Sequence, residues 1–123
     1  MTQPRTASQE ITEQVTAWPG VEAGPGKRGE FAFKVGRREI GHVHGDRAAH
    51  FGFPKEVWAE LSKQGRIVPH PVFPDAQGPA ARAIEDEADV RDVIQLLRLN
   101  YDRVVARYGL PEEASKTEPP AGA

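Results

Sequence analysis

Three stretches of the chain carry apolar residues at helical spacing, and each predicts a helix. The first covers residues 7–17, where Thr6 and Gln9 have the spacing of a capping box at its start. The second follows Pro54, which suits the first turn of a helix because a backbone N–H has no partner there. The third carries a continuous apolar stripe over residues 90–108 and is expected to end at a glycine followed by a proline.

Between these helices the apolar period changes to two, which is typical of strands. Phe31, Phe33 and Val35 alternate with smaller or polar residues and therefore share one face of a strand. Residues 36–38 predict a tight turn, and the prolines within residues 67–73 place that segment at a sheet edge. The expected strands cover residues 21–23, 31–35, 39–44, 51–53, 67–73 and 80–84.

The order of these elements predicts the fold class. Helix, four strands, helix, two strands and helix follow one another with short links, and this α-β-β-β-β-α-β-β-α order favours an α+β fold. We expect an antiparallel sheet of about five to six strands with the helices packed on one face. Residues 6–110 form a single domain in this prediction, and the polar ends, residues 1–5 and 111–123, are expected to be disordered.

Composition narrows the environments and partners that suit the chain. Its 123 residues are enough for one core, and the absence of cysteine excludes disulfides and thiolate metal sites. No apolar run has the length of a membrane helix and no leader is recognisable, which predicts a cytoplasmic protein without a membrane partner. The net charge of −2 argues against binding nucleic acid mainly through phosphate contacts. A local basic cluster nevertheless surrounds the first predicted hairpin: Lys27, Arg28, Lys34, Arg37 and Arg38.

The candidate chemistry lies in and after the predicted strand at residues 39–44. In a regular strand Ile40, His42 and His44 share a face, and because Ile40 prefers the core, we expect the helices to cover that face. His42 should then be substantially buried and His44 more exposed. A bulge at Gly41 is the alternative, since one inserted residue would move every later side chain to the other face. His70, in a rigid Pro-His-Pro segment, is expected within reach of one of them across a small cleft.

These histidines are candidate ligands of a divalent metal. His42 and His44 can approach one ion, with His70 or His50 at a third position, and imidazole suits zinc, iron, nickel or copper. The set that we favour is His42, His44 and His70, with Glu39 or Asp46 as a nearby carboxylate. The alternative is that these are polar strand positions that are hydrogen-bonded or solvated. The candidates for lining a ligand pocket are His42, His44, His70, Glu39 and Arg38.

Several segments resemble a known family. They are WPGVEAG at residues 18–24, GRREIGHVHGD at 36–46, FGFPKEV at 51–57, GRIVPHPVFP at 65–74 and DVIQLLRLNY at 92–101. Together they resemble the luciferase-like family of small bacterial domains, to which no mechanism is attached, over nearly everything between the two tails. The layout is also similar to the double-wing α+β domains of the YjbR type, through Pro19-Gly20, the FKVG hairpin at 33–36 and Tyr101. Both resemblances imply an α+β fold.

Three functions stay open at this point. The leading one is a small binding domain with a histidine-lined cleft, whose partner is an unknown small molecule or protein. The second is a metal-dependent enzyme, oxidative in one version, that uses His42, His44 and His70. The third is nucleic-acid binding through the basic hairpin, as the double-wing resemblance suggests. The oligomeric state is equally open.

Overall fold

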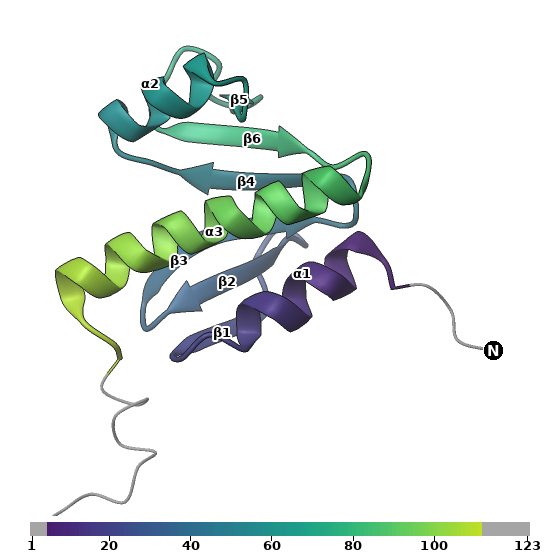
Figure 1. Ribbon diagram of the computed structural model, residues 1–123, viewed down its shortest axis with the longest axis vertical. Coiled ribbons are helices and arrows are strands. Elements are labelled where there is room, and N and C mark those ends of the chain that lie inside the picture. Colours follow the sequence, from purple (N-terminus) through teal and green to yellow (C-terminus); the bar gives the residue numbers. More distant parts are fainter. Residues whose placement is uncertain (1–4, 112–123) are drawn as a thin grey trace, which may run out of the picture.

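The computed structural model describes residues 5–111, in which a six-stranded sheet carries helices α1 and α3 across one face (Figure 1). The elements in chain order are α1 (Ala7–Thr16), β1 (Val21–Pro25), β2 (Phe31–Val35), β3 (Arg38–His44), β4 (Ala48–Gly52), α2 (Lys55–Lys63), β5 (Val68–Pro69), β6 (Pro79–Ala83) and α3 (Glu87–Tyr108). The predicted α+β class and element order are therefore confirmed. The ends that were expected to be disordered lie, apart from Arg5 and Pro111, outside the described residues.

The sheet has the strand order β1-β2-β3-β4-β6-β5, and every neighbouring pair is antiparallel. β1 to β4 form a meander, so each strand pairs with the next one in sequence. β5 is much shorter than the strand predicted over residues 67–73 and pairs only with β6. Prolines 69 and 71 account for this, since neither has an N–H to donate to a ladder.

Local signals in the sequence account for where the helices begin and end. Thr6 and Gln9 form the predicted capping box, in which each side chain accepts from the other residue's backbone N–H. α3 follows Asp86, whose carboxylate accepts from the N–H of Asp89, and it ends at Gly109 with φ at 77°. Within residues 5–111, no helix is both long enough and apolar enough to cross a membrane.

The core lies between the sheet and the helices. Phe33, Ile40 and Val43 are fully buried on the strands, and they belong to one cluster with Ile11 of α1 and Leu97 of α3. Burial of this apolar surface is the main favourable term in folding. On the opposite face of the sheet, no helix of the described chain is packed against the central strands (Figure 1).

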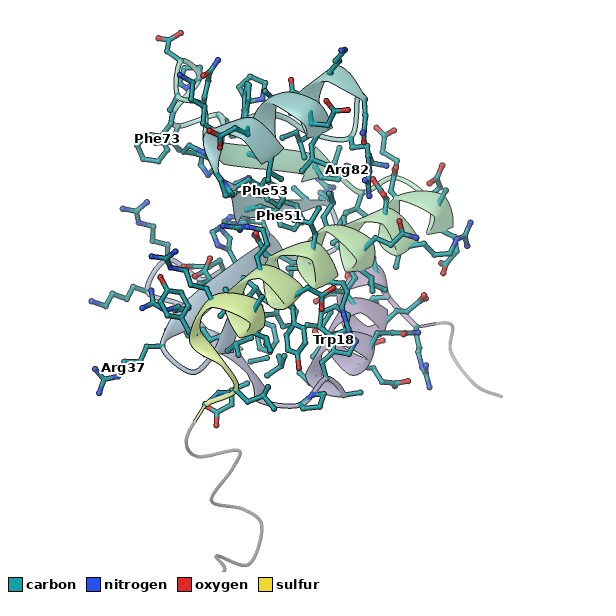
Figure 2. The ribbon with its side chains drawn as sticks, turned by 60° about the vertical axis from the view of Figure 1, so that its left-hand side comes forward. Trp18, Arg37, Phe51, Phe53, Phe73 and Arg82 are labelled. Atoms are coloured by element: carbon teal, nitrogen blue, oxygen red, sulfur yellow. The ribbon has the colours of Figure 1, made fainter. Side chains whose placement is uncertain are left out.

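The end of α1 is attached to α3 by aromatic contacts. The Tyr101 hydroxyl donates to the carbonyl of Pro19 at 2.6 Å, and its ring centroid is 5.3 Å from that of Trp18. The guanidinium of Arg98 lies 5.1 Å from the centre of the Trp18 ring. Figure 2 shows Trp18 beside α3, on the helix side of the molecule. Trp18 and Tyr101 therefore join the segment that follows α1 to α3.

Candidate metal centre

β3 contains one residue more than β2 can pair with. Phe33 of β2 pairs with Gly41, while the next residue, Lys34, pairs with Glu39. Ile40 is thus an extra residue on β3, which makes this site a β-bulge. Because side chains alternate along a strand, one inserted residue changes the face of every residue that follows it.

Because of the bulge, the side chains that follow it in β3 lie on the opposite face from the one predicted. Ile40 and Val43 are three positions apart, yet both are buried beneath the helices at 1% exposure. His42 and His44 therefore lie on the open face of the sheet and do not share a face with Ile40. That prediction was wrong because it assumed regular alternation throughout the strand. His42 is still the more buried histidine of the two, with 21% of its side chain exposed, whereas His44 is exposed.

β4 adds a third histidine to the open face. His50 lies directly opposite His42 in the β3–β4 register, so the two side chains share a face. Its neighbours Ala49 and Phe51 are buried on the helix side. Sequence reasoning gave His50 less weight than His70, although the alternation of Ala49, His50 and Phe51 was a usable signal. The cross-strand partner of His50 could not be read from that alternation alone.

All four histidine rings gather at one place. The centroid of the His50 ring lies 4.4 Å from that of His44, 5.3 Å from that of His42 and 4.2 Å from that of His70. His44 Nε2 and His50 Nδ1 are 3.1 Å apart and share a hydrogen bond. Two ligand atoms on one tetrahedral or octahedral ion are separated by about 3.0–3.4 Å when each metal–nitrogen bond is about 2.1 Å. The His44–His50 pair therefore already has the spacing of two metal ligands.

Three of these side chains bring their ring nitrogens close enough to hold one metal ion. His42, His44 and His50 each offer one ring nitrogen, and the three atoms lie within 4.8 Å of one another. The Nδ1 atom of His42 is 2.7 Å from Oε2 of Glu39, so this bond leaves Nε2 for a metal. A carboxylate that accepts from the second nitrogen of a histidine is a common supporting contact at metal sites, because it fixes the tautomer and ring orientation. The bulge permits this contact by placing Glu39 and His42 on one face.

His70 lies beside this set and is not a member of it. Its Nδ1 accepts a hydrogen bond from the N–H of Val72 at 3.1 Å, so that nitrogen is occupied. Its ring packs against His50, which it reaches from the segment after β5. The close group of three ring nitrogens therefore includes His50, whereas the favoured sequence set named His70.

The environment keeps His50 in its neutral form. Burial, together with the nearby His70, His44 and His42, lowers the pKa of His50 from 6.5 to about 4. Burial also lowers the pKa of His70, and the nearby His42 and His44 act in the same direction. A neutral imidazole is the form that binds a metal. At neutral pH, His50 therefore has a lone pair available without first losing a proton.

The histidines line a groove of about 1040 Å³ on the open face. The loop between β1 and β2 contributes to it from one end of the sheet, and Val72 and Phe73 contribute from the other. Figure 2 shows Phe73 projecting at the outside of the molecule, on the side away from α1. Small cross-strand neighbours, Gly24 and Ala32, continue the row of His42 and His50 and leave space above the sheet.

Of the remaining residues predicted to line the pocket, one lies in the groove and one lies at the end of α3. Glu39 lines the groove, as do Arg28 and Lys34 of the basic cluster. Arg38 does not, because its guanidinium lies 3.5 Å from the centre of the Tyr108 ring at the end of α3. Arg37 projects from the β2–β3 hairpin at the edge of the molecule (Figure 2). Of the five basic residues around this hairpin, Lys27, Arg28 and Lys34 therefore line the groove, and Arg37 and Arg38 lie outside it.

Comparison with known proteins places the chain in a family. The model of a family described as luciferase domain matches residues 37–100, just over half of the 123-residue chain. The matched region contains all four histidines, Glu39 and most of α3. No curated protein and no solved structure matches the chain. The likeness to double-wing domains therefore stays a prediction.

Proposed function

This chain belongs to the luciferase domain family, as its sequence motifs predicted, and we propose that it is a metal-binding domain. A divalent transition-metal ion is held by His42, His44 and His50, and the ion fixes a small molecule in the groove. The observation that carries this proposal is the convergence of three imidazole nitrogens within 4.8 Å of one another. They come from two strands, so the cluster depends on the fold and is not a local run of histidines.

The chemistry of the donor set supports a transition metal. Three neutral imidazoles suit zinc, copper, iron or nickel, whereas calcium and magnesium prefer oxygen ligands. Glu39 supplies the supporting carboxylate to His42 at 2.7 Å. Protein sites with three ligands commonly keep a further coordination position for water or substrate. Here that position would face the groove, whose volume of about 1040 Å³ is sufficient for a small molecule.

A metal-dependent enzyme is the second candidate function. The observation that favours it is the three-histidine set beside an open groove, since sites that only stabilise a fold are usually closed by a fourth protein ligand. The identity of the ion would limit the chemistry. Iron or copper can support an oxidative reaction, whereas zinc has no redox chemistry and acts as a Lewis acid or activates water. Metal identity is therefore the first quantity to measure.

The test begins with protein purified without a nickel column. Elemental analysis should find one transition metal, or the metal-free protein should bind about one equivalent of zinc in a titration against a chromophoric chelator. His44→Ala and His50→Ala should each lose this binding. His70→Ala is the matched control, because His70 is in the same groove but outside the ligand set, and it should retain the metal.

Two results would count against the proposal. Occupancy below about a tenth of an equivalent for every ion tried would remove the metal site. Loss of binding in His70→Ala with retention in His50→Ala would instead restore the set His42, His44 and His70. A purified protein that binds metal and turns over no substrate would favour the binding domain over the enzyme.

A further inference from the structure

A buried polar side chain lies beneath the histidines, on the helix side of the sheet. Asn100 of α3 is 3% exposed and is the polar residue buried in the core of the described chain. Its Nδ2 atom donates to the carbonyl of Ile40 at 3.1 Å and to that of Gly52 at 2.9 Å. Buried polar groups are costly unless they are hydrogen-bonded, so a fully bonded one in an apolar core indicates a specific role.

The orientation of the Asn100 amide is determined by Arg103. Nη1 of Arg103 donates to Oδ1 of Asn100 at 2.7 Å. A guanidinium can only donate hydrogen bonds, so the amide oxygen must face Arg103 and the amide nitrogen must face the sheet. Both N–H groups of Asn100 are thereby directed at backbone carbonyls of the two strands that carry the metal ligands.

One of those carbonyls belongs to the bulge. Ile40 is the extra residue of β3, and a bulge interrupts the regular ladder of backbone hydrogen bonds. Asn100 supplies a donor to the Ile40 carbonyl at this interruption. If β3 instead paired regularly through this point, His42 and His44 would lie beneath the helices and Val43 on the open face. The bulge thus decides whether the histidines reach the groove.

The same part of α3 also packs closely against the bulge. Gly41 is next to Ile40 and has φ at +156°, a conformation that other residues rarely adopt. A Cβ at position 41 would lie 2.5 Å from Cδ2 of Leu97, which is one helical turn before Asn100. It would also lie 3.1 Å from the backbone oxygen of His50. Leu97 and Asn100 therefore contact the bulge together, one by packing and one by hydrogen bonds.

We propose that Asn100 is a positioning residue of the metal centre. It touches neither the groove nor a ligand, and it acts by holding the bulge that places His42 and His44 on the open face. The inference rests on the proposed function only where it concerns metal affinity. The placement of the His42 ring against Glu39 can be measured without any metal.

The principal variant is Asn100→Leu, which keeps a similar size and removes both donors. Zinc affinity should fall by about tenfold to a hundredfold, the range typical of lost supporting contacts at metal sites. In the metal-free protein, heteronuclear NMR of the histidine rings should show that Nδ1 of His42 no longer shares a proton with Glu39. Tyr101→Phe is the matched control, since it also removes one hydrogen bond from α3 to a backbone carbonyl. It should change neither zinc affinity nor the His42 signals.

If Asn100→Leu does not unfold cooperatively, Arg103→Met decides the question, because Arg103 is exposed and its loss frees the Asn100 amide to turn. It should weaken zinc binding in the same direction, by less. Unchanged zinc affinity and His42 signals in Asn100→Leu, or in Arg103→Met where the first variant is unfolded, would overturn the inference. Equal losses in Tyr101→Phe would overturn it as well. If the wild-type protein binds no metal, the proposed function fails and the NMR comparison alone decides the role of Asn100.

Discussion

The two faces of the sheet are built from the same strands but carry different side chains. On the helix-covered face, Phe33, Ile40 and Val43 are fully buried in an apolar core. On the open face, residues of the same strands present imidazoles, lysine and carboxylates to a groove. β3 contributes to both, since Val43 lies between His42 and His44 in sequence and points the opposite way. Alternate residues of one strand can therefore pack in the core and line the groove.

Because the two faces are packed differently, substitutions on them should affect different properties. The helix-covered face has close packing, so removing volume there leaves a cavity that the surroundings fill only in part. The open face has solvent and a groove, so removing a side chain there exposes no new core. Stability should depend mainly on the first face and ligand binding mainly on the second.

The largest expected effect is a loss of stability from a substitution on the helix-covered face. Leu96→Ala, at a fully buried position of α3, should lower the free energy of unfolding by about 2–5 kcal/mol, since it removes contacts and leaves a cavity. Phe73→Ala, at a residue 51% exposed on the rim of the groove, should change it by no more than about 0.5 kcal/mol. Urea unfolding measures both. Similar losses at the two positions would mean that the open face is covered in solution.

The second expected effect concerns the bulge in β3, after which side chains alternate in the opposite phase. Gly41→Ala should cost about 2–4 kcal/mol, because the added Cβ is strained at its φ and overlaps Leu97. Gly45→Ala is the control, with φ at +60° and no atom within 4 Å of an added Cβ, and it should cost only the conformational strain of about 1–2 kcal/mol. Equal costs in urea unfolding would show that α3 does not press on the bulge.

The smallest expected effect is a pH dependence on the helix-covered face. Asp89 accepts from the backbone N–H of Glu85 and from Arg82 of β6, and these bonds lower its pKa below the usual 3.8. The unfolded chain therefore binds a proton at a higher pH than the folded one, so this stabilisation is present above about pH 3.8 and is lost as pH falls through the lower, folded value. The free energies of unfolding of wild type and Asp89→Asn can be compared by urea unfolding between about pH 5 and about pH 2.5. The difference between the two proteins should become smaller as the pH falls. A difference that stays constant over this range would exclude the ionised carboxylate as its source.

Much of the fold was predictable because its signals are local. The capping box at Thr6 and Gln9, the proline before α2 and the glycine after α3 each act within a few residues of the chain. Alternation in β2 and the apolar stripe of α3 likewise report which side each element buries. The family was also readable from short motifs, and the match over residues 37–100 confirms it.

The composition of the candidate site was only partly predictable. His42, His44 and Glu39 were identified by residue type, and the structure brings them to one groove. His50 received too little weight because its position opposite His42 depends on the β3–β4 register. Arg38 was expected in the pocket, and its contact with Tyr108 joins residues that are far apart in sequence. Asn100 was not singled out at all, since its neighbours in α3 form an ordinary apolar stripe.

Local signals were sufficient to predict the helices, most of the strands, the α+β class and the family, because propensity, periodicity and caps depend on neighbours along the chain. The face of the sheet that carries the histidines depends on contacts between distant residues. It is set by one extra residue at Ile40, a glycine that lets α3 approach, and hydrogen bonds from Asn100, 60 residues away. Gly41 within the strand pattern indicated where a bulge could form, but the contacts that hold the bulge are long-range, so no local pattern could show that it forms.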